Sequence, residues 1–186
     1  KRREDPRLIQ GLGTYVDDIK LVGMQHAAFK RSDLAHARIL SVDVSEAESR
    51  PGVEAVFTGA QIAEFVAPMP IGTPFPSPDH HAVAVDTVRY VGEPVAVVVA
   101  NDRYVARDAA DTIVIDYEPL PAVVDPEQAM TGQPAQIHAD FENNLAVALV
   151  PSGTGVSADL QTVDDTAVDK AFADADVVVS QRMHKI

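Results

Sequence analysis

The most regular pattern of apolar and polar positions lies between Val91 and Pro121. It opens with an unbroken apolar run, Pro94–Ala100, which is typical of a strand buried on both faces. Asn101 or Asp102 can then cap a helix with a four-residue apolar repeat. The repeat consists of Val105, Ala109 and Ile113. A second strand is predicted over Ile113–Tyr117, and prolines end it. Because the stretch contains no Cys, His or Ser, we interpret it as scaffold.

Weaker patterns predict further elements on both sides of this stretch. Strand-like alternation occupies residues 24–31, 36–44, 53–57, 80–90 and 177–186. Helical spacing occupies residues 45–49, 59–65, 125–130 and 166–175. The alternation slips at Leu40–Ser41, which predicts a β-bulge. We expect Ser45 to cap one helix, Pro126 to open another, and Thr166-x-x-Asp169 to form a capping box.

Composition sets the size and type of core. The chain has 186 residues, of which 46% are hydrophobic, so it can form one sizeable domain with a tail. Tryptophan is absent and aromatic residues are sparse, so the core is expected to consist of Val, Ala, Ile and Leu. Residues 67–78 contain five prolines and predict an extended loop, and residues 133–160 are weakly patterned. The pattern as a whole indicates a domain of mixed α and β structure.

The charge balance and the absence of cysteine exclude several functions. With 28 acidic and 15 basic residues, the formal net charge is −13, which disfavours nucleic acid and anionic membranes as partners. Without cysteine the chain can form no disulfide, no thiolate zinc site and no cysteine-ligated iron–sulfur cluster. The basic N-terminus is not followed by an apolar stretch, and no apolar run is long enough to span a bilayer. We therefore expect a cytoplasmic protein.

Two motifs resemble binding sites but lack the required context. His80-His81 follows an aspartate, but adjacent strand residues point in opposite directions and no second ligand pair accompanies them. A hydrolase built on these histidines remains a weak alternative. Gly11–Gly13 neither follows a predicted strand nor opens a helix, so we interpret it as a turn rather than a dinucleotide site.

Three further positions carry groups capable of proton transfer. For His36 we favour a strand-edge histidine bonded to a backbone carbonyl. For Glu93, before Pro94, we favour a turn carboxylate, although an acid or base role is open; Tyr117-Glu118 offers the same two readings. No serine lies in a nucleophile elbow. We therefore assign no catalytic, cofactor-binding or metal-binding residue from the sequence.

Four segments together resemble one known family. They are 2–24 (containing QGLGTYVDDIKLVGM), 31–59 (containing AHARILSVDV), 88–130 (containing VGEPVAVVVANDRYVARDAADTIVIDYEPLP) and 171–183 (AFADADVVVSQRM). In this order and spacing they resemble the N-terminal part of the molybdenum-binding large subunit of the xanthine dehydrogenase, aldehyde oxidase and aerobic carbon monoxide dehydrogenase family. The opening segments are most similar to the carbon monoxide dehydrogenase branch.

The resemblance implies an α+β fold, the α/β-hammerhead, with a mixed sheet and a few short helices. It divides the chain into an irregular lead-in (1–22), the hammerhead domain (23–150) and a segment with linker, helix and first strand (151–186). Because that strand needs a partner, we expect it to pair with a cofactor domain outside these 186 residues. We also expect an exposed apolar face that meets the cofactor domain.

The resemblance also implies cofactors and partners. A complete enzyme of this family uses a molybdenum–pterin cofactor, iron–sulfur clusters and FAD, and we expect none of these within this chain. The implied partners are a molybdenum-cofactor domain or chain, an iron–sulfur subunit and an FAD subunit. The chain is then a structural, non-catalytic part of an oxidoreductase. The alternative is an independent binding or assembly module with the same fold.

Overall fold

The computed structural model describes residues 2–69, 78–131, 135–141, 144, 148–149, 156–157 and 166–183. The chain divides into two compact units. The first comprises Lys1–Pro68 and His81–Pro121, and the second comprises Met69–His80 and Ala122–Ile186. No helix among the described residues is both long and apolar enough to cross a membrane.

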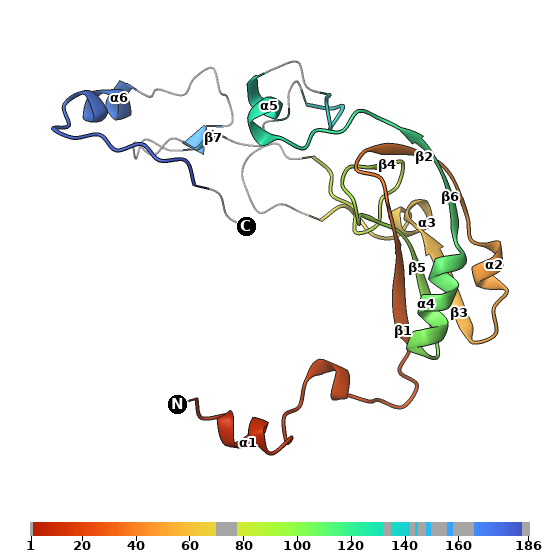
Figure 1. The fold of residues 1–186 in the computed structure, drawn as a ribbon. Helices are drawn as coiled ribbons and strands as arrows, with labels where there is room; N and C mark the ends of the chain where they lie inside the picture. Colours follow the sequence, from red (N-terminus) through yellow and green to blue (C-terminus); the bar gives the residue numbers. More distant parts are fainter. Residues whose placement is uncertain are drawn as a thin grey trace. The chain divides into compact units, whose positions relative to one another are not determined.

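The first unit contains most of the regular structure (Figure 1). Its strands are β1 (His26–Arg31), β2 (Ala37–Asp43), β3 (Val53–Thr58), β4 (Thr87–Val88), β5 (Pro94–Ala100) and β6 (Val114–Pro119). Its helices are α1 (Asp5–Ile9), η1 (Val16–Asp18, a 3-10 turn), α2 (Ser45–Glu48), α3 (Gly59–Ala63) and α4 (Arg103–Thr112).

The predicted apolar strand is the centre of the first sheet. β5 lies between β1 and β3, antiparallel to both. Ala96, Val98 and Ala100 are fully buried on the face that α4 covers. The strand–helix–strand prediction for this stretch is therefore confirmed.

Small side chains let α4 lie close to the first sheet. Ala106, Ala109 and Ala110 are buried on its inner face, so the apolar stripe is wider than the predicted four-residue repeat. Of the two predicted caps, Asn101 and Asp102, it is Asp102 that caps α4: its Oδ1 accepts hydrogen bonds from the amides of Tyr104 (2.7 Å) and Val105 (3.3 Å).

The second sheet has the strand order β4-β2-β6, and the bulge predicted at Leu40–Ser41 is confirmed by the register shift between Ile39 and Ser41. All pairs in the described residues are antiparallel, so the α+β class is confirmed but the mixed sheet was wrong. The reason is the path of the chain: α4 leads from β5 to β6, which joins the other sheet beside β2. A helix crossover therefore creates no parallel neighbours here.

The structure corrects two further predictions. Ser45 does not cap α2 but is its first residue, and both its amide (3.0 Å) and its hydroxyl (2.6 Å) donate to Asp43 Oδ1. These bonds favour the charged carboxylate and lower the pKa of Asp43. The strand predicted over residues 80–90 is confined to Thr87–Val88. Elsewhere, Thr58 forms a capping box with Gln61 that the sequence reading missed.

The second unit contains α5 (Pro126–Thr131), β7 (Ala148–Leu149), β8 (Val156–Ser157) and α6 (Thr166–Ala173). Pro126 opens α5 as predicted, and Asp125 Oδ1 accepts from the amides two and three residues later. α6 begins at Thr166, and the residue before it lies outside the described part, as do most of the predicted proline loop and residues 184–186. The strand predicted from Val177 does not form over residues 177–183, where the described chain offers no pairing partner.

Candidate functional site

Among the described residues, one face of the first sheet is covered by α4 and the other is open. Residues directly opposite each other in a sheet point to the same side, so the register identifies the open face. Its members are Ala27 and Phe29 on β1, Val97 and Val99 on β5, and Ala55 and Phe57 on β3. None is fully buried, and Phe29 is 40% exposed. The exposed apolar face expected from the family resemblance is therefore present.

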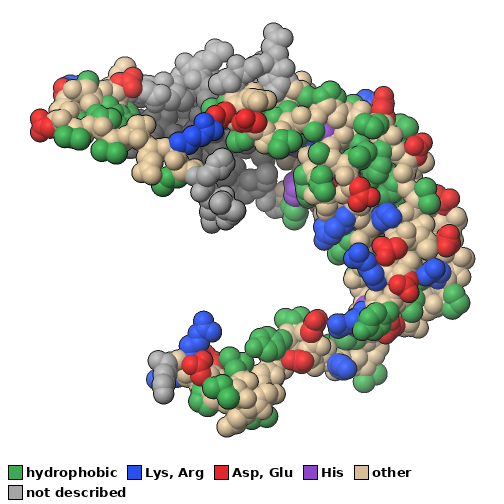
Figure 2. Space-filling view, viewed as in Figure 1, with side chains coloured by type: hydrophobic (Ala, Val, Ile, Leu, Met, Phe, Trp, Pro, Cys, Tyr) green, Lys and Arg blue, Asp and Glu red, His purple; other side chains and the backbone are tan. Residues whose placement is uncertain are grey.

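Aromatic side chains extend the open face at both edges. The Phe65 ring, 67% exposed, packs edge-on against Phe57 with the ring centroids 6.3 Å apart. On the other edge, the Arg31 guanidinium lies 5.6 Å from the centre of the Phe29 ring. A contiguous apolar surface with this polar border is suited to protein contact rather than to bond-making chemistry. Figure 2 shows that hydrophobic side chains also reach the surface in the N-terminal segment.

A cluster of buried polar side chains lies where β1 ends and β5 begins. Ser32 (2% exposed), His36 (6%) and Glu93 (7%) belong to it. The Ser32 amide donates to the Glu93 carbonyl (2.9 Å), and the Ser32 carbonyl accepts from the Gly92 amide (2.7 Å). The Ser32 hydroxyl donates to the Leu34 carbonyl (2.9 Å) and accepts from the Leu34 amide (3.0 Å). We call this set, with Tyr117, the polar cluster; the sequence reading gave no role to Ser32.

Glu93 occupies a turn, which favours the structural reading of this residue. One of its carboxylate oxygens accepts a hydrogen bond from the Arg89 amide, and its own amide donates to the Tyr90 carbonyl (3.2 Å). Gly92 has a φ of 89°, a conformation that side chains rarely adopt. The carboxylate is thus committed to the backbone of its own turn.

His36 joins the beginning of β2 to the segment that follows β6. Its Nδ1 lies 2.7 Å from the Pro121 carbonyl oxygen, which can only accept, so Nδ1 carries the proton. The Leu120 amide donates to the His36 carbonyl (2.9 Å). The prediction of a histidine bonded to a backbone carbonyl is confirmed.

Tyr117 and Glu118, which the sequence could not distinguish, have different surroundings. The Tyr117 hydroxyl is buried and makes no hydrogen bond of good geometry to any described residue. Burial raises the pKa of this phenol, the Ser32 side chain lowers it through a weak hydrogen-bonding contact, and the charges of Asp33 and Glu93 raise it. Glu118 is half exposed and forms an ion pair with Arg38 on the adjacent strand.

The remaining candidates form no site within the described residues. His80 is exposed, and no group of three described metal-ligating side chains exists there or elsewhere. Gly11 ends α1 with a φ of 70° and its amide donates to the Leu8 carbonyl, so the turn reading of Gly11–Gly13 is confirmed. The open face and the polar cluster are therefore the two features from which a function can be argued.

The two small antiparallel sheets, the covering helix and the polar turn between them define a hammerhead domain. Residues 10–121 match the family model for the a/b hammerhead domain of aldehyde oxidase and xanthine dehydrogenase, which covers more than half of the chain. The chain belongs to this family and corresponds to the hammerhead part of its large subunits.

Named relatives agree with this assignment. The chain is 45% identical to the carbon monoxide dehydrogenase large chain of Afipia carboxidovorans over 80% of its length, and 38% identical to the 6-hydroxypseudooxynicotine dehydrogenase complex subunit gamma of Paenarthrobacter nicotinovorans over 97%. The solved structure of quinoline 2-oxidoreductase from Pseudomonas putida 86 covers 83% of the chain with a TM-score of 0.72 and 41% identity. The chain spans about a fifth of the length of these proteins.

Proposed function

We propose that this chain is the hammerhead module of a molybdenum hydroxylase large subunit and that its open face packs against the remainder of that subunit. The module takes no direct part in the redox chemistry. The observation that carries the proposal is the apolar row across all three strands of the first sheet, which α4 leaves uncovered on one side. Family membership supports it, because relatives include the molybdenum-binding subunit of xanthine dehydrogenase.

The donor groups of the chain support a non-catalytic role. The sequence contains no cysteine, so it cannot hold an iron–sulfur cluster by thiolates. The described histidines and carboxylates form no group of three, and His36 and Glu93 are engaged with backbone atoms. These residues do not fit a metal site. We propose that the molybdenum–pterin cofactor, the iron–sulfur clusters and FAD lie on other domains or subunits, which are the partners of this module.

The proposed arrangement also divides the chain into three segments. Residues 1–22 are the lead-in, 23–150 the hammerhead domain, and 151–186 the connection toward a cofactor-binding region. In the last of these, Val177 and Val179 are 77% and 83% exposed, which suits a segment that becomes a paired strand on assembly. The cytoplasmic location stays a prediction.

Turnover by the chain alone tests the non-catalytic part of the proposal. The purified 186-residue chain is mixed with an artificial electron acceptor dye and with aldehyde or purine substrates, and its molybdenum and iron contents are measured. We expect no dye reduction and no stoichiometric metal. Robust dye reduction by the purified chain would overturn the proposal.

Assembly tests the role of the open face. The tagged chain is expressed in its native source and captured, and molybdenum, iron and flavin are measured in the captured material. Phe29→Ser on the open face should reduce all three at least fivefold. Leu40→Ser is the matched control, because Leu40 is 55% exposed but lies on the second sheet. If both variants capture the same amounts as the unchanged chain, the open face is not the docking surface.

A further inference from the structure

The second sheet ends in a strand whose outer edge pairs with no described residue. β6 is an edge strand and, among the described residues, pairs only with β2. Hydrogen bonds near its end show which way its backbone groups point. The Leu120 amide donates to His36 on the β2 side, whereas the Ile39 amide of β2 donates away from β6, to Asp86 (2.8 Å). Since backbone groups alternate along a strand, Glu118 faces β2, and Ile115 and Tyr117 direct their N–H and C=O groups outward.

The other three edge strands of the first unit carry features that discourage pairing with any strand, whereas the charged side chains of β6 are acidic and discourage only a partner that is not basic. β4 has only two residues. β1 contains Lys30 and Arg31, and β3 has a register shift between Val53 and Ala55. Short strands, basic residues and irregular registers are the usual means by which proteins block sheet edges. β6 is six residues long, contains no lysine, and has its proline only at the last position.

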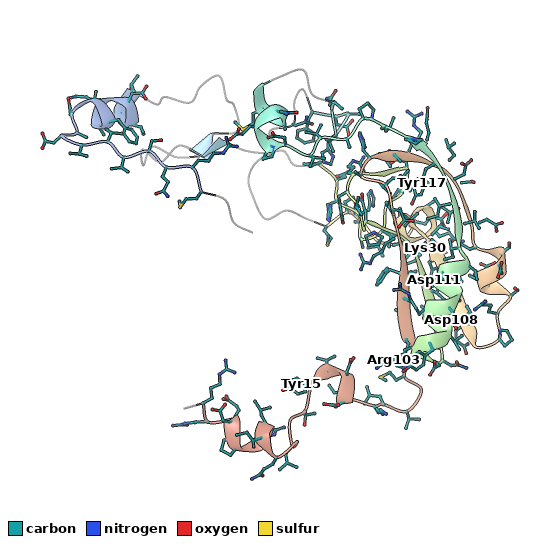
Figure 3. The ribbon with its side chains drawn as sticks, in the orientation of Figure 1. Tyr15, Lys30, Arg103, Asp108, Asp111 and Tyr117 are labelled. Carbon is teal, nitrogen blue, oxygen red and sulfur yellow. The ribbon has the colours of Figure 1, made fainter. Side chains whose placement is uncertain are left out.

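The side chains of β6 specify the chemistry of a strand that could pair with it. Ile115 and Tyr117 are half buried on the inner face, where they pack against the core. Tyr117 is labelled in Figure 3. Asp116 and Glu118 are exposed on the outer face, and Asp116 has no basic partner among the described residues. A neighbouring strand would therefore place apolar residues inside and basic residues outside, because opposite charges across a strand pair are stabilising.

A second copy of this chain does not have that pattern. If two copies paired through antiparallel β6 strands, with Ile115 of each copy opposite Tyr117 of the other, Asp116 of one copy would lie opposite Asp116 of the other. Directly opposed like charges are destabilising, and the net charge of −13 adds to the repulsion between copies.

We propose that the edge of β6 binds an extended segment of a partner subunit in which apolar and basic side chains alternate, by addition of a strand to the second sheet. The outward groups of Ile115 and Tyr117 supply the main-chain hydrogen bonds. Asp116 supplies the preference for a basic partner. This surface is separate from the open face, so its failure would leave the proposed docking of the first sheet unaffected.

The test uses the 186-residue chain and a hexapeptide of alternating lysine and valine as the probe. Amide hydrogen exchange and amide chemical shifts are followed with and without the peptide. We expect exchange of the Ile115 and Tyr117 amides to be unprotected in the chain alone and slowed at least tenfold at saturation. A glutamate–valine hexapeptide should produce no change.

Paired variants connect binding to this edge. Asp116→Asn should weaken peptide binding about two- to fivefold. The matched control is Glu54→Gln, an exposed carboxylate on the edge strand of the other sheet, which should leave binding unchanged. Ile115→Pro removes the outward amide of residue 115, which makes no hydrogen bond to β2, and this variant should abolish peptide binding. Ile115→Val keeps the amide and should retain binding. If the proline variant unfolds, the two carboxylate variants still decide the question.

Four results would overturn the proposal. They are protection of both amides in the chain alone, absence of peptide binding at millimolar concentration, a greater effect of Glu54→Gln than of Asp116→Asn, and dimerisation of the chain that Ile115→Pro abolishes. The first would show that the chain covers its own edge, and the last that a second copy does.

Discussion

Gly59 lies where α3 meets the backbone between the two sheets, and we expect Gly59→Ala to destabilise the first unit strongly. A Cβ at this position would lie 1.8 Å from the Ala84 carbonyl oxygen and 2.6 Å from its carbon. Since Cβ atoms essentially never approach within 3.0 Å of another heavy atom, the two backbones would have to separate by more than 1 Å. The obstacle is main chain, so no side-chain rotation can relieve the clash.

The surroundings of Ala84 determine the magnitude. Val83 and Ala84 are 3% and 5% exposed, and the Ala84 amide donates to the Pro94 carbonyl at 2.8 Å. Overpacking of this kind costs about 1–3 kcal/mol, and loss of the hydrogen bond adds about 1 kcal/mol. Alanine has lower conformational entropy than glycine in the unfolded chain, which offsets roughly 0.4–1 kcal/mol of this loss. We therefore expect a net loss of about 2 kcal/mol in the free energy of unfolding.

Urea unfolding followed by tyrosine fluorescence measures this loss specifically. The four tyrosines, at positions 15, 90, 104 and 117, all lie in the first unit, and the chain has no tryptophan. Ala60→Ser is the control: it adds one heavy atom at the next, exposed position of α3 and should change stability by less than about 0.5 kcal/mol. If Gly59→Ala unfolds at the same urea concentration as the unchanged chain, the close approach to Ala84 does not exist in solution.

Three further predictions follow from the core and the polar cluster. Tyr117→Phe should leave stability unchanged or raise it by up to about 1 kcal/mol, because the buried hydroxyl makes no hydrogen bond of good geometry to the described residues. Since the pKa of Tyr117 is raised above its ordinary 10.0 in the folded state, the unchanged chain should lose stability as the pH rises past 10.0, and Tyr117→Phe should lose less; equal losses would contradict this. Asp102→Ala should cost about 1 kcal/mol in urea unfolding through loss of the α4 cap, whereas Asp102→Asn should cost less. Val98→Thr should lower the free energy of unfolding by about 1–3 kcal/mol, because it buries a hydroxyl beneath α4. Val97→Thr on the open face should lower it by about 0.5 kcal/mol or less. Equal changes in the melting temperatures of the two variants would argue against the assignment of the two faces.

Elements with a local chemical signal could be predicted from the sequence. The Asp102 cap, the proline at the start of α5 and the bulge at Leu40–Ser41 each depend on residues close together in the chain, and each is confirmed. The sheet arrangement depends on which strand lies beside which, and no local pattern encodes that. The family resemblance implied a mixed sheet, but the chain places β6 beside β2, and the two strands are antiparallel.

The candidate site was partly predictable for the same reason. The contact of His36 with a carbonyl follows from its place at a strand edge, yet the identity of that carbonyl, Pro121, required the fold. Ser32 carried no sequence signal beyond a polar residue before a turn. Its importance follows from burial, since its amide and carbonyl both bond to the Gly92-Glu93 turn. Long-range bonds of this type become visible only when the segments are in place.

The apolar sequence of β5 supports the proposed docking of the open face. Its apolar run predicted burial on both faces, but the structure covers the sheet with α4 on one face only, leaving Val97 and Val99 half buried. A free-standing antiparallel sheet with one solvated face normally alternates apolar and polar residues. In β5, polar residues are missing from the positions that face away from the helix. Solubility alone would favour polar residues there, so the uninterrupted run indicates a second cover that the described residues do not supply. This agrees with the proposal that the open face packs against the remainder of a large subunit.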